Sequence, residues 1–551
     1  MTGFRTGIYG FKAVTKLIPF VTPTHRLSSR LEDNGRNVHP NEDKLILVAG
    51  ATGYVGGKLV PRLLQAGYRV RCLMRRPANI QHEPWLPLVE CVEGDVLRPE
   101  TLRPAMEGVT AVYYLVHSIG SGRDFAEQDL AGARHCATAA KVEGVRRIIY
   151  LGGLGDPAAK ISAHLRSRQE TGSALCDAGV PVTEFRAAVI VGSGSLSFEL
   201  IRYLSERLPV MICPRWVYTR IQPIAIQNVL DYLVAALQQP DSAGRIIEIG
   251  GEDVLSYGGL METYASVRGL KRYLLPVPFL TPRLSSYWVR LVTPFSVSLA
   301  RPLIEGLRNE VIVCGNAARE IFSKVQLLDC KTAVEVALAR GEAKQLANSL
   351  GRFAIPSSQQ PSVSMCTEEG MILERRRRSV NASADKVYSI IAKMGGERGW
   401  LALNWASQLR GWIDQILGGV GMRRGKGGGL RIGAALDFWR IEAVEAGRSI
   451  RLRAEMKLPG KGWLQFQVEP QSAMRSELIQ TALFEPKGLA GVLYWFSLYP
   501  VHRLIFSGMI QRIAEAAEAP VVVLVRRKDK NPAILKFTGL RVVCFAMDQR
   551  L

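Results

Sequence analysis

The sequence predicts two folded units in series, a doubly wound α/β domain with a parallel sheet and then a smaller α+β domain. From Lys44 onward, short apolar runs alternate with amphipathic helical patterns, which is typical of parallel βαβ units. After a stretch rich in Ser, Pro and Gln, the pattern changes to one helix, consecutive strands and a long last helix. The chain of 551 residues is also too long for one ordinary domain.

Each unit is delimited by these changes in composition. Residues 1–43 combine an acid-poor basic stretch with a polar run, which favours disorder, with a targeting segment as the alternative. The final segment has no assigned role. The expected divisions are an N-terminal extension over 1–43, the α/β domain over 44–340, a linker over 341–365, the α+β domain over 366–519 and a C-terminal extension over 520–551.

The individual elements follow from apolar periodicity. The first domain should contain strands at 45–50, 68–75, 111–118, 146–153, 181–192 and 245–251, with helices at 54–67, 196–208 and within 220–237. The second should contain strands at 371–380, 436–444, 450–457, 462–470 and 476–486, and a helix opening near Ser383 as N-cap. This layout predicts a curled sheet that grips a helix.

Charge and cysteine usage narrow the choice of partners. Lys and Arg outnumber Asp and Glu by 71 to 49, a net charge of +22 that favours phosphorylated cofactors or anionic lipid. The densest basic run, at 374–378, has no RNP-like or zinc-finger pattern, which argues against nucleic acid. The nine cysteines and seven histidines show no metal-ligand spacing, so no metal site is expected and a reducing, cytoplasmic compartment fits best.

Two apolar stretches bear on membrane contact. Arginines interrupt the stretch at 274–304, and Pro500, His502 and Arg503 interrupt the one at 489–510, so neither is expected to cross a bilayer. We expect 489–510 to be buried against the second sheet. Peripheral contact with the inner face of an anionic membrane is the alternative.

A glycine motif marks a dinucleotide site. Gly50, Thr52, Gly53, Tyr54, Val55 and Gly56 belong to GATGYVG, which follows an apolar strand and opens a helix. Glycines there permit a tight turn, close approach of a pyrophosphate and helix–strand packing. The second strand ends in Arg75 and Arg76 without an acidic residue, so we expect NADP(H) to be preferred over NAD(H). The alternative is that both arginines are solvated surface residues.

The motifs GATGYVG, EGDVLRPETL and VTEFRAAVIVGSGS resemble the atypical, NmrA-like short-chain dehydrogenase/reductase superfamily over residues 44–340. This resemblance implies a Rossmann fold. It also implies that Asp95 and Val96 border the adenine and that Val116 and His117 border the cofactor ribose.

The second unit also carries a resemblance. DFWRIEAVEAG, AEMKLPGKGWLQFQVEP and FEPKGLAGVLYW are similar to an uncharacterised domain of the DUF2867 type that is often fused behind such bacterial reductases. That domain is itself similar to the START/Bet v1-like helix-grip fold. The resemblance implies a cavity for an apolar small molecule.

The chain departs from the superfamily at the catalytic position. Its catalytic unit is Tyr-x-x-x-Lys, but no tyrosine occurs between Gly155 and Val180, where His164 and Arg168 stand instead. We hypothesise that His164, with an ordinary pKa near 6.5, acts as general acid and that Arg168 holds the ribose. The alternative is that both are exposed residues of a domain that binds NADPH without catalysis. The basic run at 422–429 lacks a phosphate-loop ending and is interpreted as a flexible loop.

These observations predict an NADPH-dependent reductase of an unidentified apolar carbonyl or quinone. Two other classes stay open: a non-catalytic NADPH-binding sensor or assembly factor at a membrane complex, and a carrier of lipid or polyketide.

Overall fold

The computed structural model describes residues 41–75, 83–117, 125–156, 161–277, 293, 304–351, 362–394, 431–436 and 438–519, and three two-residue strands beyond them. Over 341–351 only the backbone is described. Several sequence features therefore lie outside the described residues: the extension up to residue 40, Arg76, most of the apolar stretch at 274–304, the basic loop at 422–429 and most of 520–551.

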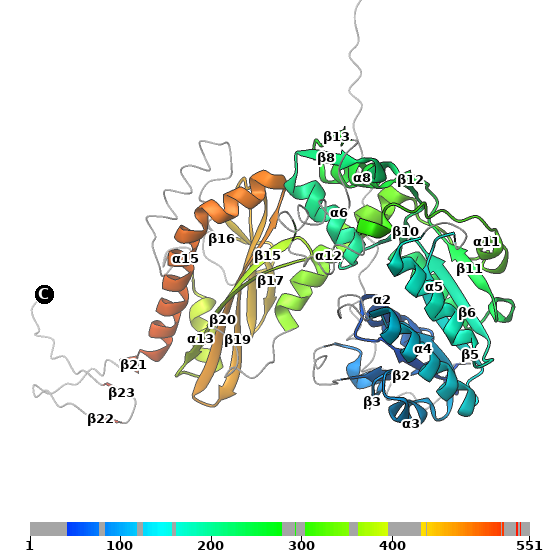
Figure 1. The fold of residues 1–551 in the computed structure, drawn as a ribbon. Helices are drawn as coiled ribbons and strands as arrows, with labels where there is room; N and C mark the ends of the chain where they lie inside the picture. Colours follow the sequence, from blue (N-terminus) through cyan, green and yellow to red (C-terminus); the bar gives the residue numbers. More distant parts are fainter. Residues whose placement is uncertain are drawn as a thin grey trace, which may run out of the picture.

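The first domain is built on a seven-stranded parallel sheet with the order β11-β6-β5-β4-β1-β2-β3 (Figure 1). Chain order reverses between β1 and β4, so their carboxyl ends border a crevice of the kind that binds ligands in doubly wound sheets. The strands are β1 (Leu45–Ala49), β2 (Arg69–Met74), β3 (Glu90–Glu93), β4 (Val109–Tyr114), β5 (Arg147–Gly153), β6 (Val182–Ala187) and β11 (Ile246–Ile249).

Helices cover both faces of this sheet because its central strands are apolar on both sides. Ile46 and Val48 of β1 pack toward α2 (Tyr54–Gln65) and α7 (Ile226–Ala236). Leu47 and Ala49 point the other way, as alternating strand residues must. That second face is covered by α3 (Leu102–Met106), α4 (Phe125–Val142) and α5 (Ala163–Cys176).

A third apolar cluster lies beyond the carboxyl ends of the strands and surrounds α6 (Leu196–Arg207). Nearly every residue of α6 is buried, including its polar ones. The elements around α6 are β7 (Ile190–Val191), β8 (Val210–Pro214), β9 (Arg220–Ile221), β10 (Ile224–Ala225), β12 (Leu255–Ser256), α8 (Tyr257–Arg268), β13 (Tyr273–Val277) and α12 (Cys330–Gly351). Helix α11 (Ala317–Ile321) instead packs beside β11 in the first apolar cluster.

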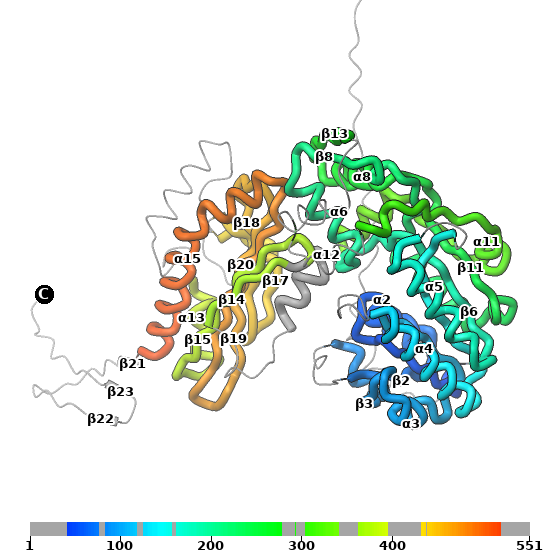
Figure 2. The backbone as a smooth tube through the Cα atoms, in the orientation of Figure 1, coloured from blue at the N-terminus to red at the C-terminus, as the bar shows by residue number. Residues whose placement is uncertain are grey.

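The second domain is a seven-stranded antiparallel sheet with the order β14-β15-β20-β19-β18-β17-β16 (Figure 2). One apolar cluster joins a face of this sheet to α13 (Ala384–Ile391) and α15 (Gly488–Glu518). As expected, Ser383 caps α13 by accepting from Lys386 N. The strands are β14 (Val363–Glu368), β15 (Met371–Val380), β16 (Ala435–Leu436), β17 (Trp439–Glu445), β18 (Ser449–Ala454), β19 (Gly460–Ser472) and β20 (Arg475–Pro486).

The predicted fold class is therefore confirmed: a Rossmann-like parallel sheet is followed by an α+β domain. The linker boundaries differ from the prediction. Helix α12 continues to Gly351, because residues 338–350 are mostly good helix formers, and β14 already begins at Val363. The Ser- and Pro-rich stretch between these two elements lies outside the described residues.

Helix α15 accounts for the apolar stretch at 489–510. Trp495, His502 and Met509 are buried, whereas Leu493 and Leu504 are exposed on the same helix. Within the part of the chain that the structure describes, no helix has the length and apolar character needed to span a membrane.

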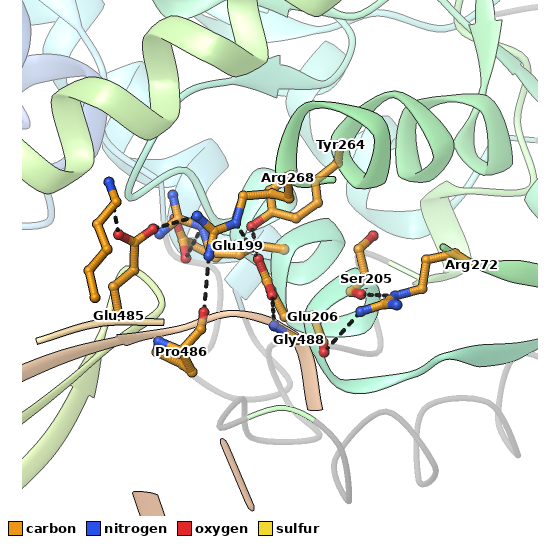
Figure 3. A network of polar contacts seen from close by, with 11 residues as sticks. Glu199, Ser205, Glu206, Tyr264, Arg268, Arg272, Glu485, Pro486 and Gly488 are labelled. Carbon is orange, nitrogen blue, oxygen red and sulfur yellow. Dashed lines mark hydrogen bonds and ion pairs between the residues drawn. The ribbon is translucent and has the colours of Figure 1, made fainter. Parts of the chain in front are cut away.

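The two domains meet through a buried ionic network at the end of α6 (Figure 3). Glu206 accepts hydrogen bonds from Arg268 Nε (2.7 Å), from Tyr264 Oη (2.9 Å) and from the backbone N–H of Gly488 (2.6 Å). Arg268 Nη1 in turn contacts Glu485 Oε1 at 2.7 Å. Because Gly488 and Glu485 belong to the second domain, α6 is held by both domains.

Candidate functional site

The glycine loop between β1 and α2 has two positions, Gly50 and Gly56, at which its backbone lies unusually close to neighbouring backbone atoms. Gly50 has a φ of +95°, and a Cβ there would lie 2.7 Å from the carbonyl oxygen of Leu115. A Cβ on Gly56 would lie only 2.2 Å from the carbonyl oxygen of Gly50. Neither position tolerates a side chain, so the loop can turn tightly and the first turn of α2 can press against the strand end.

A cavity of about 700 Å³ opens over this loop at the carboxyl ends of the strands. It brings together residues that are widely separated in the sequence. Of the sequence-predicted site residues only Arg76 is missing from its wall, and Arg76 lies outside the described residues. The predicted residues that line the cavity are Gly50, Thr52, Gly53, Tyr54, Val55, Gly56, Arg75, Asp95, Val96, Val116, His117, His164 and Arg168.

The end of β2 is basic, as the sequence indicated. Arg75 is exposed and lines the cavity immediately after the strand. Asp95, which follows β3, lines the same cavity; its Oδ1 accepts from the N–H of Leu97 at 3.0 Å and so fixes the turn after β3. A guanidinium at this strand end can pair with an anionic group of a bound ligand.

Two histidines stand together in the cavity wall. His117 Nδ1 lies 2.9 Å from Asp129 Oδ2, which holds the neutral ring in its Nδ1–H tautomer with Nε2 as an acceptor. Burial lowers the pKa of His117 despite this carboxylate. The ring centroid of His164 is 5.1 Å from that of His117.

The protonation state of His164 differs from our expectation. Burial, followed by the positive charge that His117 or Arg168 would add, lowers its pKa to about 3. The assumption of an ordinary value near 6.5 is therefore wrong, because that value applies to a solvated ring. At neutral pH His164 is uncharged and can donate or accept a hydrogen bond but cannot supply an imidazolium proton.

Arg168 is anchored to the end of β5 and is not a free surface residue. Its Nη2 donates to the carbonyl oxygen of Leu151, and its guanidinium lies 4.8 Å from the ring centroid of Tyr150. Tyr150 Oη donates to the carbonyl oxygen of Arg168 at 2.8 Å. The alternative that His164 and Arg168 are exposed helix residues thus does not hold, since both are largely buried in the cavity wall.

Several buried polar atoms of the cavity residues have no hydrogen-bond partner in the described part of the chain. Such atoms are costly unless a ligand satisfies them, by roughly 1–3 kcal/mol each. Their presence fits a large polar ligand such as a dinucleotide. They are Tyr54 Oη, His117 Nε2, His164 Nδ1, Arg168 Nη1 and Trp216 Nε1.

The sequence did not reveal the apolar part of the cavity. The i, i+4, i+5, i+8 spacing on α6 indicated an apolar face but not that this face lines a cavity. The apolar wall comprises Leu196, Leu200, Ile201 and Leu204 of α6 together with Trp216, Tyr257, Met261, Ile304, Leu307 and Val311.

Among the described residues, no group of metal-ligating side chains is present.

Comparison with known proteins agrees with this geometry. Residues 50–175 match the family model described as NAD(P)H-binding. The first domain is an NAD(P)H-binding domain of the atypical short-chain dehydrogenase/reductase type. Residues 371–509 match the model described as protein of unknown function, DUF2867. The likeness of this second domain to START proteins stays a resemblance.

Curated relatives include both an assembly factor and reductases. The photosystem II assembly factor Ycf39 of Trieres chinensis is 29% identical over 38% of this chain and 64% of its own length. The chain therefore spans less than two thirds of that relative. A ceramide reductase of Caulobacter vibrioides is 28% identical over 42% of this chain and 74% of its own length.

Among solved structures, the triphenylmethane reductase of Citrobacter sp. in complex with NADP(H) is 18% identical and covers 53% of this chain and 99% of its own, with a TM-score of 0.44.

The glycine loop yields a paired prediction. A Cβ on Gly53 would lie 3.2 Å from Gly50 O, a contact that small shifts can relieve, while the side chain would occupy the cavity. Gly53→Leu should therefore retain the fold and abolish NADPH binding. Gly56→Ala should instead lower the melting temperature, because its Cβ meets backbone. Calorimetric titration measures the loss of NADPH binding in Gly53→Leu, and thermal unfolding measures the loss of stability in Gly56→Ala. Undiminished NADPH binding by Gly53→Leu would refute the assignment of this cavity as the dinucleotide site.

The pKa of His164 predicts a pH dependence of stability. Since the folded value of about 3 lies below the unfolded value near 6.5, the stability linked to His164 is complete above pH 6.5 and is lost as pH falls toward 3. At pH 5 the loss should be roughly 2 kcal/mol relative to pH 8. The free energy of unfolding of His164→Gln, measured with urea, should therefore depend less on pH than that of the wild type. At pH 8 the difference between the two proteins reports only the packing cost of the substitution. An equal dependence on pH in both proteins would contradict the lowered pKa.

Proposed function

We propose that this protein is an NADPH-dependent reductase of an apolar carbonyl compound or quinone. The observation that carries the proposal is that one cavity contains both the glycine loop and an extended apolar wall, with His117 and His164 also lining it. A dinucleotide and an apolar substrate would then share one cavity, as hydride transfer requires.

The residues present fit the cofactor. The N–H groups at the start of α2 would hold the pyrophosphate, Arg75 the 2′-phosphate, Asp95 and Val96 the adenine, and His117 Nε2 a ribose hydroxyl. Arg168 Nη1 is available to the same ribose. Bound NADPH would supply the hydride.

His164 and Arg168 would act on the substrate oxygen. In its Nδ1–H tautomer, neutral His164 donates a hydrogen bond from an atom that has no partner within the described chain. The nearby positive charge of Arg168 favours negative charge developing on that oxygen. This role replaces the general-acid hypothesis, because a ring with a pKa of about 3 is not protonated at neutral pH. The oxyanion formed by hydride transfer would take its proton from water at the open side of the cavity. The relative named ceramide reductase supports the reaction class.

The second candidate is a non-catalytic NADPH-binding assembly factor. Helix α5 carries no Tyr-x-x-x-Lys pair, and a relative is named as an assembly factor of photosystem II. In this case the cofactor would stabilise a conformation of the protein without being consumed.

Cofactor selectivity is tested at Arg75. Arg75→Ala should weaken NADPH binding by roughly tenfold, the order expected for losing a hydrogen bond to a charged group, and leave NADH binding unchanged. Calorimetric titration with both cofactors measures the difference, and Arg134→Ala, an exposed arginine paired with Asp177, is the matched control. Equal losses for both cofactors would show that Arg75 does not read the 2′-phosphate. The double variant Arg75→Ala/Arg76→Ala should lose at least as much NADPH affinity, relative to NADH affinity, as Arg75→Ala alone.

Catalysis is tested by following NADPH oxidation with a panel of apolar aldehydes, ketones and quinones. If one is turned over, His164→Phe should slow single-turnover hydride transfer by roughly a hundredfold, as removal of one donor to a developing oxyanion does. The NADPH affinity of the variant serves as its control and should be kept. An unchanged rate would remove His164 from the mechanism; tight NADPH binding without turnover across the panel would favour the assembly role.

A further inference from the structure

The turn between β14 and β15 has an unusual residue. Glu369 and Gly370 form a two-residue hairpin with φ angles of +48° and +82°. Turns of this type favour Asn, Asp or Gly at the first position, because other residues rarely adopt positive φ. Glu369 is the only non-glycine residue with positive φ in the described ranges, so the turn carries glutamate at a conformational cost.

This hairpin turn of the second domain packs against the first domain. Ser193 Oγ donates to Glu369 Oε2 at 2.8 Å, and Arg202 Nη2 donates to Ser193 Oγ at 3.1 Å. A Cβ on Gly370 would lie 2.8 Å from Arg202 Cδ, so the hairpin turn packs directly on α6. Ser193 belongs to the turn at 192–195 that leads into α6.

The same turn is contacted by the glycine loop. A Cβ on Gly192 would lie 2.2 Å from Tyr54 Oη. A Cβ on Gly194 would meet Glu369 Oε1 at 3.0 Å and the ring of Tyr54 at 3.4 Å. Burial and then the charge of Glu369 raise the pKa of Tyr54, in keeping with this proximity. Tyr54 directly follows Gly53 and lines the cavity, as does Ser195 of the turn.

We propose that Glu369 of the second domain is a positioning residue for the dinucleotide site. Through Ser193 it fixes the turn at 192–195, which supports the ring of Tyr54 and with it the first turn of α2. The second domain thereby completes a site whose lining residues all belong to the first. This inference rests on the proposed dinucleotide site, and one arm of its test is independent of cofactor binding.

The informative variant is Glu369→Asn. Asparagine suits the hairpin turn better than glutamate and is too short to reach Ser193, so the melting temperature should be kept or raised. NADPH affinity, measured by calorimetric titration of the full chain, should nevertheless fall by roughly tenfold, the order of one lost charge-assisted hydrogen bond. Ser193→Ala should cause a similar loss, and the double variant should lose little more than either alone.

The matched control is Glu485→Gln, which weakens the contact between the domains at the other end of α6, next to Arg268. It should leave NADPH affinity within twofold of the wild type. An equal loss in this variant would mean that domain docking in general, and not Glu369, supports the site, and would overturn the proposal.

The independent arm is hydrogen–deuterium exchange without cofactor. The amides of residues 53–57 should exchange several-fold faster in Glu369→Asn than in the wild type or in Glu485→Gln. Unchanged exchange there would overturn the positioning role whatever the chain binds. If exchange rises while the wild type fails to bind NADPH, the dinucleotide assignment fails and the structural coupling stands.

Discussion

The close approach of Gly56 to the carbonyl oxygen of Gly50 is the constraint on which the site depends. A single methyl group at Gly56 would stand 2.2 Å from that oxygen, so helix and strand can meet only if neither carries a side chain there. This contact directs the start of α2 over the carboxyl edge of the sheet, where β4 ends near His117 and β5 ends near Leu151. Residues far apart in the chain consequently face one cavity.

Electrostatics within this space are dominated by burial. Histidines that would carry partial charge in water are held neutral by burial, while the charge of Arg168 and the opposing charge of Asp129 both act on them. A neutral donor next to a fixed positive charge favours ligands that are acceptors or acquire negative charge. The apolar wall contributed by α6 lowers the local dielectric beside these groups and strengthens each of these interactions.

The sequence predicted those features that depend on local patterns. Apolar runs located most strands of both sheets, and GATGYVG located the glycine loop, because glycine spacing reports backbone demands directly. Strand β14 was missed because VSMCTE shows no clear alternation and follows a polar stretch. The pKa of His164 was misjudged because its burial depends on elements far away in the chain. Contacts such as Ser193 with Glu369, 176 residues apart, leave no local signature.

Helix α6 also bears on how the two halves can change over evolutionary time. Its apolar side lines the cavity, while Glu199, Arg202 and Glu206 are buried on its other sides, the last two of them against the second domain. A helix with no solvent-facing side cannot drift in sequence independently of either neighbour. Exchanging the second domain for that of a distant homologue would leave buried charges without partners unless α6 were exchanged with it. The contacts around α6 thus tie the stability of each domain to the side chains of the other.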